Sequence, residues 1–298
     1  MTPLQKEQLQ LVKSKPGFIA ALDQSGGSTP RTLNSYGLDS SEWGSDDEMF
    51  AKVHDMRIRI MTSPAFTGDR VLGAILFEDT MMRRIGGLCS AEYLWEKKKI
   101  IPFLKVDKGL EAEVDGAQLM KPHPEIDDVL DLGRTKGIFG TKMRSVIKMG
   151  NAKGVNAIVD QQFAIGKRIA AKGLIPMLEP EIDIKSPEKG EAEILLKDSL
   201  LNALDSLGEG EMVMLKLTPP EVDNFYKQCI DHPKCVRVVA LSGGYSREEA
   251  IARLKRQEGM IASFSRGLCE GLSIKQSDDE FNEMMDASVQ AIFEASRT

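Results

Sequence analysis

The sequence predicts an α/β protein built as a (β/α)8 TIM barrel. Three observations lead to this fold class: short apolar runs recur eight times along the 298 residues, each run ends in polar or charged side chains, and helical patterns fill the gaps. Continuous rather than alternating hydrophobicity is typical of parallel strands that are buried on both faces. Eight repeats of strand and helix in a chain of this length match the usual size of such a barrel.

The eight apolar runs are the expected strands. They cover residues 18–22, 71–77, 100–104, 138–141, 175–178, 212–217, 236–241 and 260–262. Among the polar residues that end them are Asp23 after the first run, Glu179 after the fifth and Ser242 after the seventh. The carboxyl ends of the strands carry the catalytic groups in barrels of this kind, so these residues become candidates for a site.

Helices are expected between the strands. Residues 46–61, 155–172, 192–207 and 281–293 carry apolar residues at helical spacing. Ser246 followed by Glu249 is typical of a capping box, which would open a helix through Leu254. A doubly wound open sheet is the alternative fold, although no Gly-x-Gly-x-x-Gly motif follows the first expected strand.

The composition limits the class of protein. We expect residues 1–298 to form a single domain, because no Pro/Gly/Ser-rich linker divides them. No apolar run approaches the ~20 residues of a membrane span, and the amino terminus lacks the layout of a signal peptide. The four cysteines form no CxxC pair, which favours reduced thiols and a cytoplasmic protein. The net charge of −6 argues against nucleic acid as a partner, while a homo-oligomer stays open.

Lys216 is the first candidate for chemistry. It lies at the inner end of an apolar run that Pro219 and Pro220 close, so we expect it at the carboxyl end of a buried strand. Burial disfavours the charged form of an amine and makes such a lysine a candidate nucleophile. A lysine that only snorkels or pairs with a carboxylate is the alternative, and it would be the better interpretation of a lone lysine.

The other strand ends would bring charged side chains to the same mouth. The residues expected there are Asp23, Lys105, Asp107, Lys142, Arg144, Glu179, Glu181 and Lys216. Glu179 and Glu181 are two residues apart, so in an extended strand both side chains point into the barrel. Two carboxylates in unlike surroundings can serve as acid and base. The alternative is that these glutamates only pair with Lys142 and Lys216.

Metal chemistry is poorly supported by the sequence. The three histidines are His54, in an expected helix, and His123 and His232, each followed by proline. No pair has the spacing of a zinc site, and none of them ends an expected strand. A hard-cation site built from carboxylates is the alternative, although the interleaved lysines would oppose it. We therefore expect no metal and no cofactor, and covalent catalysis through Lys216 is the better explanation.

Glycine-rich loops indicate phosphate binding. Ser242-Gly243-Gly244 follows the seventh expected strand and precedes a capped helix, where backbone amides can approach an anion. Ser265 and Arg266 follow the eighth strand, and barrels commonly bind phosphate with the loops after these two strands. A further loop, Ser25-Gly26-Gly27-Ser28, follows the first strand, with Arg31 close behind. Two anion sites around a buried lysine suggest a substrate that is phosphorylated at both ends.

Five ordered motifs then resemble a known family. They are Leu22-Asp23-Gln24-Ser25-Gly26-Gly27-Ser28, Lys105-Val106-Asp107-Lys108-Gly109, Leu178-Glu179-Pro180-Glu181-Ile182, Met214-Leu215-Lys216 and Leu241-Ser242-Gly243-Gly244. This set is similar to class I fructose-bisphosphate aldolase over roughly residues 18 to 270. The resemblance implies a (β/α)8 barrel, a carbon–carbon lyase of glycolysis and gluconeogenesis, and reversible, metal-independent cleavage of fructose 1,6-bisphosphate into dihydroxyacetone phosphate and glyceraldehyde 3-phosphate.

The resemblance also implies roles for individual residues. Lys216 would form the Schiff base and Glu179 would be the main proton donor and acceptor. Asp23 and Lys142 would handle the hydroxyls and charge around the cleaved bond, with Glu181 orienting its neighbours. Ser242, Gly243 and Gly244 would hold the ketone-side phosphate, and Lys105 and Ser28 the distal one, with Ser25 and Arg144 at the same mouth. The chemistry agrees, because a carbanion next to a carbonyl needs an electron sink, which a protonated imine supplies.

The chain departs from the animal members of that family and resembles the shorter bacterial-type branch. Leu268 stands where the animal enzymes carry an arginine, so we expect Arg266 to take over that phosphate contact. The chain ends at Thr298 without the terminal tyrosine of those enzymes, which leaves open the group that protonates the enamine. A tagatose-bisphosphate aldolase and a catalytically retired barrel that binds sugar phosphates or a protein partner are the alternative functions.

Overall fold

Parallel strands form a barrel in the computed structural model, which describes residues 1–25 and 29–298. Within this part of the chain the strand order is β1-β2-β5-β7-β8-β9-β10-β11, and every neighbouring pair is parallel. The backbone N–H of Ala21 in β1 donates to the carbonyl oxygen of Phe264, just after β11, at 3.1 Å. This bond brings the two outer strands together and nearly closes the sheet, so the prediction of a (β/α)8 barrel is confirmed.

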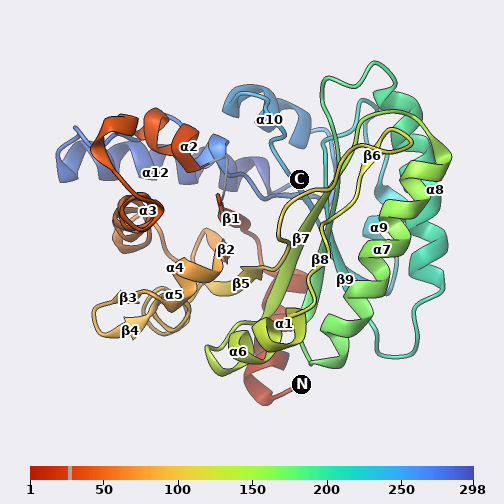
Figure 1. Ribbon diagram of the computed structural model, residues 1–298, viewed down its shortest axis with the longest axis horizontal. Helices are drawn as coiled ribbons and strands as arrows, with labels where there is room; N and C mark the ends of the chain where they lie inside the picture. The colour runs from red at the N-terminus through yellow and green to blue at the C-terminus, as the bar shows by residue number, and fades with distance from the viewer. Residues whose placement is uncertain (26–28) are drawn as a thin grey trace.

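Each of the eight predicted runs overlaps a strand. The bounds are β1 Phe18–Leu22, β2 Val71–Leu76, β5 Ile101–Lys105, β7 Gly140–Ile147, β8 Ile175–Ile182, β9 Val213–Leu217, β10 Cys235–Ala240 and β11 Ile261–Ala262. Helices cover the outside of this sheet. Figure 1 shows α7 and α8 on the side of β7, β8 and β9, and α2, α3 and α12 gathered on the opposite side of the molecule.

Two strands are longer than their apolar runs. The expectation that Lys142, Arg144, Glu179 and Glu181 follow strands is wrong, because they lie inside β7 and β8. The paired register of these strands continues to Ile147 and Ile182, and the short strand β6, Ala117–Gln118, adds an antiparallel partner to the end of β7. The backbone therefore stays hydrogen-bonded at the mouth, and the charged side chains have the fixed direction of strand residues.

The five predicted helices are all present. They are α3 Asp46–Thr62, α7 Ala152–Ala171, α8 Lys189–Asp205, α10 Arg247–Leu254 and α12 Asp278–Ala295. Ser246 caps α10 by accepting the backbone N–H of Glu249 at 3.2 Å, as expected. The prediction that the Glu249 carboxylate bonds back to the N–H of Ser246 is wrong, because this carboxylate pairs with Arg253 Nε at 2.7 Å.

Several shorter elements lie outside those predictions. They are α1 Pro3–Ser14, α2 Thr29–Tyr36, the 3-10 turn Ser40–Glu42, α4 Glu78–Met82, the hairpin β3 Arg84–Ile85 and β4 Leu88–Cys89, α5 Ser90–Lys98, α6 Ile126–Thr135, α9 Lys227–Ile230 and α11 Arg266–Cys269. The signal for α1 was present in the sequence, since Thr2 and Gln5 form a capping box around Pro3. Val12 of α1 packs with Ile19 and Phe103 in the cluster of barrel side chains, so this helix contributes to the core.

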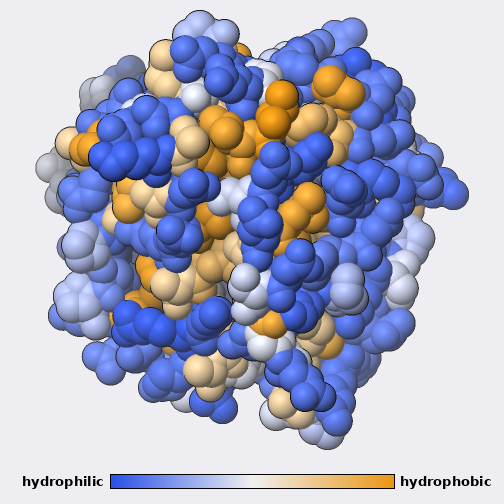
Figure 2. All heavy atoms as spheres, turned by 90° about the vertical axis from the view of Figure 1, so that its right-hand side faces the viewer, coloured by the Kyte–Doolittle hydropathy of each residue, from blue (hydrophilic) through white to orange (hydrophobic). Residues whose placement is uncertain are grey.

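The core has two parts. One apolar cluster contains alternate residues of the strands, such as Ile19, Phe103 and Met177, and a larger one joins the other strand faces to the helices. No helix among the described residues is long and apolar enough to cross a membrane. Figure 2 shows the side that carries α7 and α8 as largely hydrophilic, with apolar side chains gathered near its middle.

Candidate active site

The side chains of the inner cluster change character along each strand. In β8, Ile175 and Met177 belong to the apolar cluster, and Glu179 is the next residue on that face. In β9, Met214 of the cluster is followed two positions later by Lys216. Because alternate residues of a strand share a face, the same columns that fill the barrel below deliver charged groups to its carboxyl end.

A cavity of about 1070 Å³ opens at this end of the barrel. Its lining includes the predicted site residues Asp23, Ser25, Lys105, Lys142, Arg144, Glu179, Glu181, Lys216, Ser242, Gly243, Gly244, Ser265 and Arg266. Ser28, together with Gly26 and Gly27, lies outside the described residues. The structure thus gathers in one cavity all the predicted residues that it describes.

Four buried side chains form a chain of ion pairs at the bottom of the cavity, and we call them the catalytic cluster after the role that the sequence predicted for them: Asp23, Lys142, Glu179 and Lys216. Lys142 Nζ lies 2.6 Å from Asp23 Oδ2 and 2.9 Å from Glu179 Oε2. Lys216 Nζ lies 3.1 Å from Glu179 Oε1. Two carboxylates therefore compensate two ammonium groups, and Glu179 connects the two lysines.

The charges of the catalytic cluster control its protonation. Burial alone would raise the pKa of Asp23 and of Glu179, but the charges of Lys142 and Lys216 outweigh burial and hold both pKa values below their usual range. For Lys142, burial alone would lower the pKa, and the charges of Asp23 and Glu179 raise it instead. In the unliganded site Glu179 is therefore an ionised carboxylate, and Lys142 is an ammonium that keeps its proton.

Glu179 retains some hydrogen-bonding capacity. Its Oε2 is buried and, among the residues that the structure describes, has no aligned hydrogen-bond donor, although Lys142 Nζ is within ion-pair distance. A buried oxygen without an aligned donor costs free energy unless another group donates a hydrogen bond to it. An acceptor of this kind beside a cavity suits a hydroxyl group or water molecule that takes part in a reaction.

A second group of charges lies further out on the same strands. Arg144 Nε pairs with Glu181 Oε2 at 2.5 Å, and Lys105 Nζ pairs with Asp107 Oδ1 at 2.8 Å. Asp107 also accepts the backbone N–H of Arg144 at 3.3 Å. Burial alone would lower the pKa of Arg144, but the Glu181 carboxylate raises it. The alternative that both glutamates only pair with Lys142 and Lys216 therefore describes Glu179 and not Glu181.

The glycine loop after β10 has a conformation that favours glycine. Gly243 has φ +58° and Gly244 has φ +113°. A Cβ on Gly243 would lie 2.9 Å from Leu241 Cδ1 and 3.0 Å from Ile184 Cγ2, so these two side chains would have to shift to admit one. The N–H of Tyr245 donates to the carbonyl of Ser242 at 2.8 Å and closes the turn. Gly244 lines the cavity without a side chain to keep a ligand away from its backbone.

Arg266 lies beside this loop. The Nη2 of Arg266 would be 3.4 Å from a Cβ placed on Gly244. The expectation that Arg266 directly follows the eighth strand is wrong. β11 ends at Ala262, and Arg266 is the first residue of the short helix α11. Among the described residues no ion pair joins Arg266 to Glu270, whose carboxylate instead accepts the N–H of Arg247 at 3.1 Å. Leu268, at the position of the animal arginine, is fully buried.

Residues that sequence reasoning missed hold the loop after β1. The fully buried Arg57 donates to the Gln24 carbonyl oxygen and to Thr80 Oγ1, each at 2.5 Å, and Gln24 Nε2 donates to Ser265 Oγ at 2.6 Å. A signal existed for Arg57, because it stands among Val53, Met56 and Ile60, on the apolar face of a predicted helix. Buried arginines are rare unless paired, so one at such a place indicates a structural role.

The structure also bears on the metal question. Among residues 1–25 and 29–298 there is no group of three His, Cys, Asp or Glu side chains arranged to hold a metal ion. The four cysteines are free thiols.

Comparison with known proteins decides the family. The family model of class I fructose-bisphosphate aldolase, a glycolytic family, matches residues 4–191. The class 1 fructose-bisphosphate aldolase of Synechocystis sp. is 59% identical over 293 residues, which are 98% of this chain and 98% of that protein. The chain belongs to the class I fructose-bisphosphate aldolase family.

Solved structures agree with the fold. A fructose-bisphosphate aldolase from Plasmodium falciparum, solved with TRAP and a small-molecule inhibitor, superposes with a TM-score of 0.81 at 19% identity, over 100% of this chain and 96% of that one. An archaeal fructose-1,6-bisphosphate aldolase, solved with its catalytic lysine covalently bound to the carbinolamine intermediate of the substrate, reaches a TM-score of 0.53 at 10% identity. The matched region is 97% of this chain and 99% of the archaeal chain. At these identities the likeness supports the barrel fold of the family.

Proposed function

We propose that Lys216 is the residue through which this class I fructose-bisphosphate aldolase, a carbon–carbon lyase, forms a Schiff base with its substrate. The observation that carries the proposal is the placement of Lys216 Nζ 3.1 Å from Glu179 Oε1 at the bottom of the cavity. A buried amine beside a buried carboxylate can pass its proton to that carboxylate and become a nucleophile. The covalent lysine intermediate of the archaeal aldolase supports the same chemistry.

Imine formation uses Lys216 and Glu179. Glu179 takes a proton from the Lys216 ammonium, and the neutral amine adds to the ketose carbonyl to give a carbinolamine. The carbinolamine hydroxyl then leaves as water with a proton that Glu179 returns, which forms the protonated imine. The lowered pKa of Glu179 fits the first of these steps, because an ionised carboxylate is needed to accept the proton. Lys142 keeps its own proton and stabilises negative charge nearby.

Cleavage uses the imine as an electron sink. Asp23 accepts the proton of the hydroxyl on the far carbon of the bond that breaks, and the bonding electrons move onto the imine nitrogen to give an enamine. The aldehyde leaves as glyceraldehyde 3-phosphate. Protonation of the enamine carbon and addition of water to the imine then release dihydroxyacetone phosphate and restore Lys216. Asp23 suits the base role because its lowered pKa keeps it ionised.

Two groups of residues at the cavity wall would hold the phosphates. Ser242, Gly243, Gly244, Ser265 and Arg266 line the cavity after β10 and β11 and would bind the ketone-side phosphate. Ser25, Lys105 and Arg144 line it after β1, on β5 and on β7, and would bind the distal phosphate with Ser28, while Glu181 keeps Arg144 in place. A small phosphorylated sugar is thus the proposed partner. We further propose that residues 1–298 act as one cytoplasmic catalytic domain, without nucleic acid or membrane partners, and a homo-oligomer is compatible with this proposal.

Borohydride trapping tests the proposal. The protein is incubated with dihydroxyacetone phosphate and sodium borohydride, digested, and examined by mass spectrometry. The expected result is one reduced adduct on Lys216, with none when the substrate is left out. Cleavage of fructose 1,6-bisphosphate should persist after dialysis against EDTA, and tagatose 1,6-bisphosphate, assayed in parallel, measures selectivity for the epimer. An adduct on Lys142 or on no lysine, or activity that requires a divalent ion, would contradict the mechanism.

A further inference from the structure

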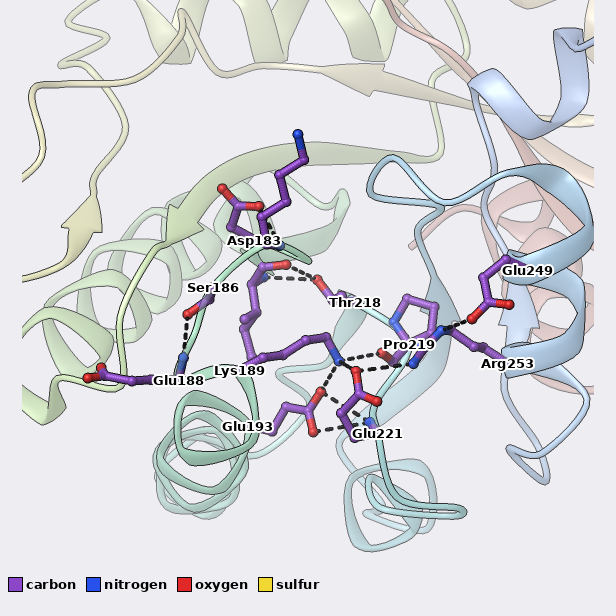
Figure 3. A network of polar contacts seen from close by, with 12 residues as sticks. Asp183, Ser186, Glu188, Lys189, Glu193, Thr218, Pro219, Glu221, Glu249 and Arg253 are labelled. Atoms are coloured by element: carbon purple, nitrogen blue, oxygen red, sulfur yellow. Dashed lines mark hydrogen bonds and ion pairs between the residues drawn. The ribbon is translucent and has the colours of Figure 1, made fainter.

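Another charged cluster lies on α8, on α10 and in the loop after β9, outside the cavity (Figure 3). Its four charged members are Lys189, the first residue of α8, Glu193 one turn later, Glu221 in the loop after β9, and Arg253 on α10. Lys189 Nζ contacts Glu193 Oε1, lies 2.9 Å from Glu221 Oε1 and donates to the Pro219 carbonyl oxygen at 3.0 Å. Glu193 is only 1% exposed and Lys189 only 7%.

This cluster holds the loop that follows Lys216. The loop begins Thr218-Pro219-Pro220-Glu221, and its two prolines have no backbone N–H to donate. Thr218 Oγ1 accepts the N–H of Ile182 at 2.9 Å and donates to the carbonyl oxygen of Ile182 at 2.7 Å, which ties the loop to the end of β8. The N–H of Glu221 donates to the Glu193 carboxylate at 3.2 Å. The chain after Lys216 is therefore fixed at both ends of the diproline segment.

The same cluster reaches the glycine loop through Arg253. Arg253 Nη1 pairs with Glu221 Oε1 at 3.1 Å, and Arg253 Nε pairs with Glu249 at 2.7 Å. The Arg253 guanidinium lies 4.4 Å from the ring centroid of Tyr245, within the range of a cation–π contact. Tyr245 directly follows Gly244, so a side chain on α10 supports the turn that would bind phosphate.

The sheet alone does not hold these two loops. β9 ends at Leu217 and β10 ends at Ala240, with Leu241 N–H donating to the Leu217 carbonyl oxygen at 2.9 Å. In the substrate, the carbonyl carbon and the carbon that bears the ketone-side phosphate are bonded to each other. The distance between Lys216 and the glycine loop must therefore match a fixed molecular length, and errors of ~1 Å in such placement can cost about 100-fold in rate.

We infer that Lys189, Glu193, Glu221 and Arg253 form a positioning cluster that sets the spacing between Lys216 and the Ser242–Gly244 loop. None of the four residues touches the cavity, so they act through the loops that they hold. A buried ion pair such as that of Lys189 with Glu193 contributes little net stability compared with apolar packing, and one reason to keep it is that it specifies a single arrangement. This inference rests on the proposed function of the cavity and adds residues to it that no motif identified.

Arg253→Met tests the phosphate side of the cluster. The change removes the ion pair with Glu221 and the contact with Tyr245, in a side chain that is 16% exposed. We expect KM for fructose 1,6-bisphosphate to rise about ten-fold, with a smaller change in kcat. The preference for dihydroxyacetone phosphate over dihydroxyacetone in trapping should fall as well. Arg253→Lys keeps a charge for Glu221 and should recover part of the loss.

Glu193→Gln tests the Lys216 side. The amide keeps the shape of the side chain but removes the charge that faces Lys189, so the diproline loop should lose part of its anchor. We expect the rate constant of borohydride trapping to fall about five-fold for dihydroxyacetone phosphate and for dihydroxyacetone alike, because the lysine and not the phosphate is displaced. If this variant does not fold, as thermal unfolding will show, the two Arg253 variants carry the test.

A matched control lies nearby. Arg256 Nη1 pairs with Asp223 Oδ1 at 3.2 Å, between the same two segments, but both side chains are exposed. Arg256→Gln should leave KM, kcat and trapping at the wild-type values. A KM in Arg253→Met equal to that of the wild type would overturn the inference. So would losses of activity and trapping that only follow the fraction of protein that is folded. Failure of the wild-type protein to cleave or trap substrate would instead contradict the proposed function of the cavity.

Discussion

The catalytic cluster and the positioning cluster have the same charge inventory. Each contains two carboxylates and two cations: Asp23, Glu179, Lys142 and Lys216 in one, and Glu193, Glu221, Lys189 and Arg253 in the other. Each also has a glutamate between two cations. The catalytic cluster lines the cavity, whereas no member of the positioning cluster does.

The lysines show what the difference means. Lys189 has three acceptors for its three N–H groups, namely Glu193, Glu221 and the Pro219 carbonyl. Among the described residues Lys216 has a single ion pair, with Glu179, and it faces the cavity. An amine that fills all its hydrogen bonds with protein groups must break them before it can react. We therefore expect access and spare bonding capacity, rather than residue type or burial, to make Lys216 reactive and Lys189 structural.

The strongest test of this comparison is Lys216→Met. Methionine removes the amine with little change in volume, so borohydride trapping and cleavage should both disappear. The fold should persist, because Glu179 keeps Lys142 as a partner at 2.9 Å. Activity assays, mass spectrometry and thermal unfolding measured by circular dichroism check the three parts. Lys197→Met, a change on α8 away from the cavity, is the control and should trap substrate normally. Substrate-dependent labelling that survives in Lys216→Met would show that another lysine is the nucleophile.

A smaller effect is expected for the carboxylate that serves Lys216. Glu179→Gln keeps the shape but removes the exchangeable proton, and general acid–base groups are typically worth ~10² to 10⁴ in rate. The loss should appear mainly in kcat, because Glu179 would act in forming the imine and not in holding phosphate.

Glu181→Gln is the matched comparison for Glu179→Gln. Glu181 is on the same face of β8, but its partner is Arg144 and not a lysine of the catalytic cluster. Glu181→Gln should lower kcat less than Glu179→Gln does and should raise KM more, since Arg144 would lose its orientation near the distal phosphate. Steady-state kinetics of both variants decide the matter, and an equal or larger loss of kcat in Glu181→Gln would reverse the two assignments.

The fold was largely predictable because the residues that define the strands are buried and therefore apolar. Apolar runs such as 18–22 and 236–241 had to be buried on both faces, and a parallel barrel is the arrangement that buries them. The extents of β7 and β8 were not predictable from apolarity, because these strands continue through charged residues. Their ends are set by pairing with each other and with β6, a tertiary effect that a local pattern does not record.

The candidate site divides in the same way. Residues that end or continue apolar runs, such as Asp23, Glu179 and Lys216, were found because charge at the end of a buried strand is unusual. Arg57 was missed although it stands on the apolar face of a helix, because its partners are a backbone carbonyl and a hydroxyl from distant segments. The positioning cluster was missed for a similar reason. Lys189 and Glu193 are four residues apart in a helix, which on a solvent-exposed face would be an ordinary surface pair, and only the packing of the diproline loop buries them.

The smallest of these effects is expected at the edge of the cavity, where Arg266, unlike the four residues of the catalytic cluster, is exposed. Its guanidinium lies beside Gly244, and its planar fork can bond two phosphate oxygens at once. A charge-assisted contact of this kind is worth ~1.5 to 3 kcal/mol, or about one to two powers of ten in affinity. Arg266→Ala should therefore weaken the binding of dihydroxyacetone phosphate by that factor and leave the binding of dihydroxyacetone nearly unchanged.

Calorimetric titration of both ligands into wild-type and Arg266→Ala protein measures this difference directly. Arg256→Ala, which removes another exposed arginine at a distance from the cavity, controls for the change in net charge. Lowering the ionic strength should widen the gap between wild type and Arg266→Ala, because the contact is electrostatic and partly screened at the surface. A phosphate preference that is the same in both proteins would show that the glycine loop binds phosphate through its backbone amides alone. The cation that stands in for the animal arginine would then have to come from elsewhere on the cavity wall.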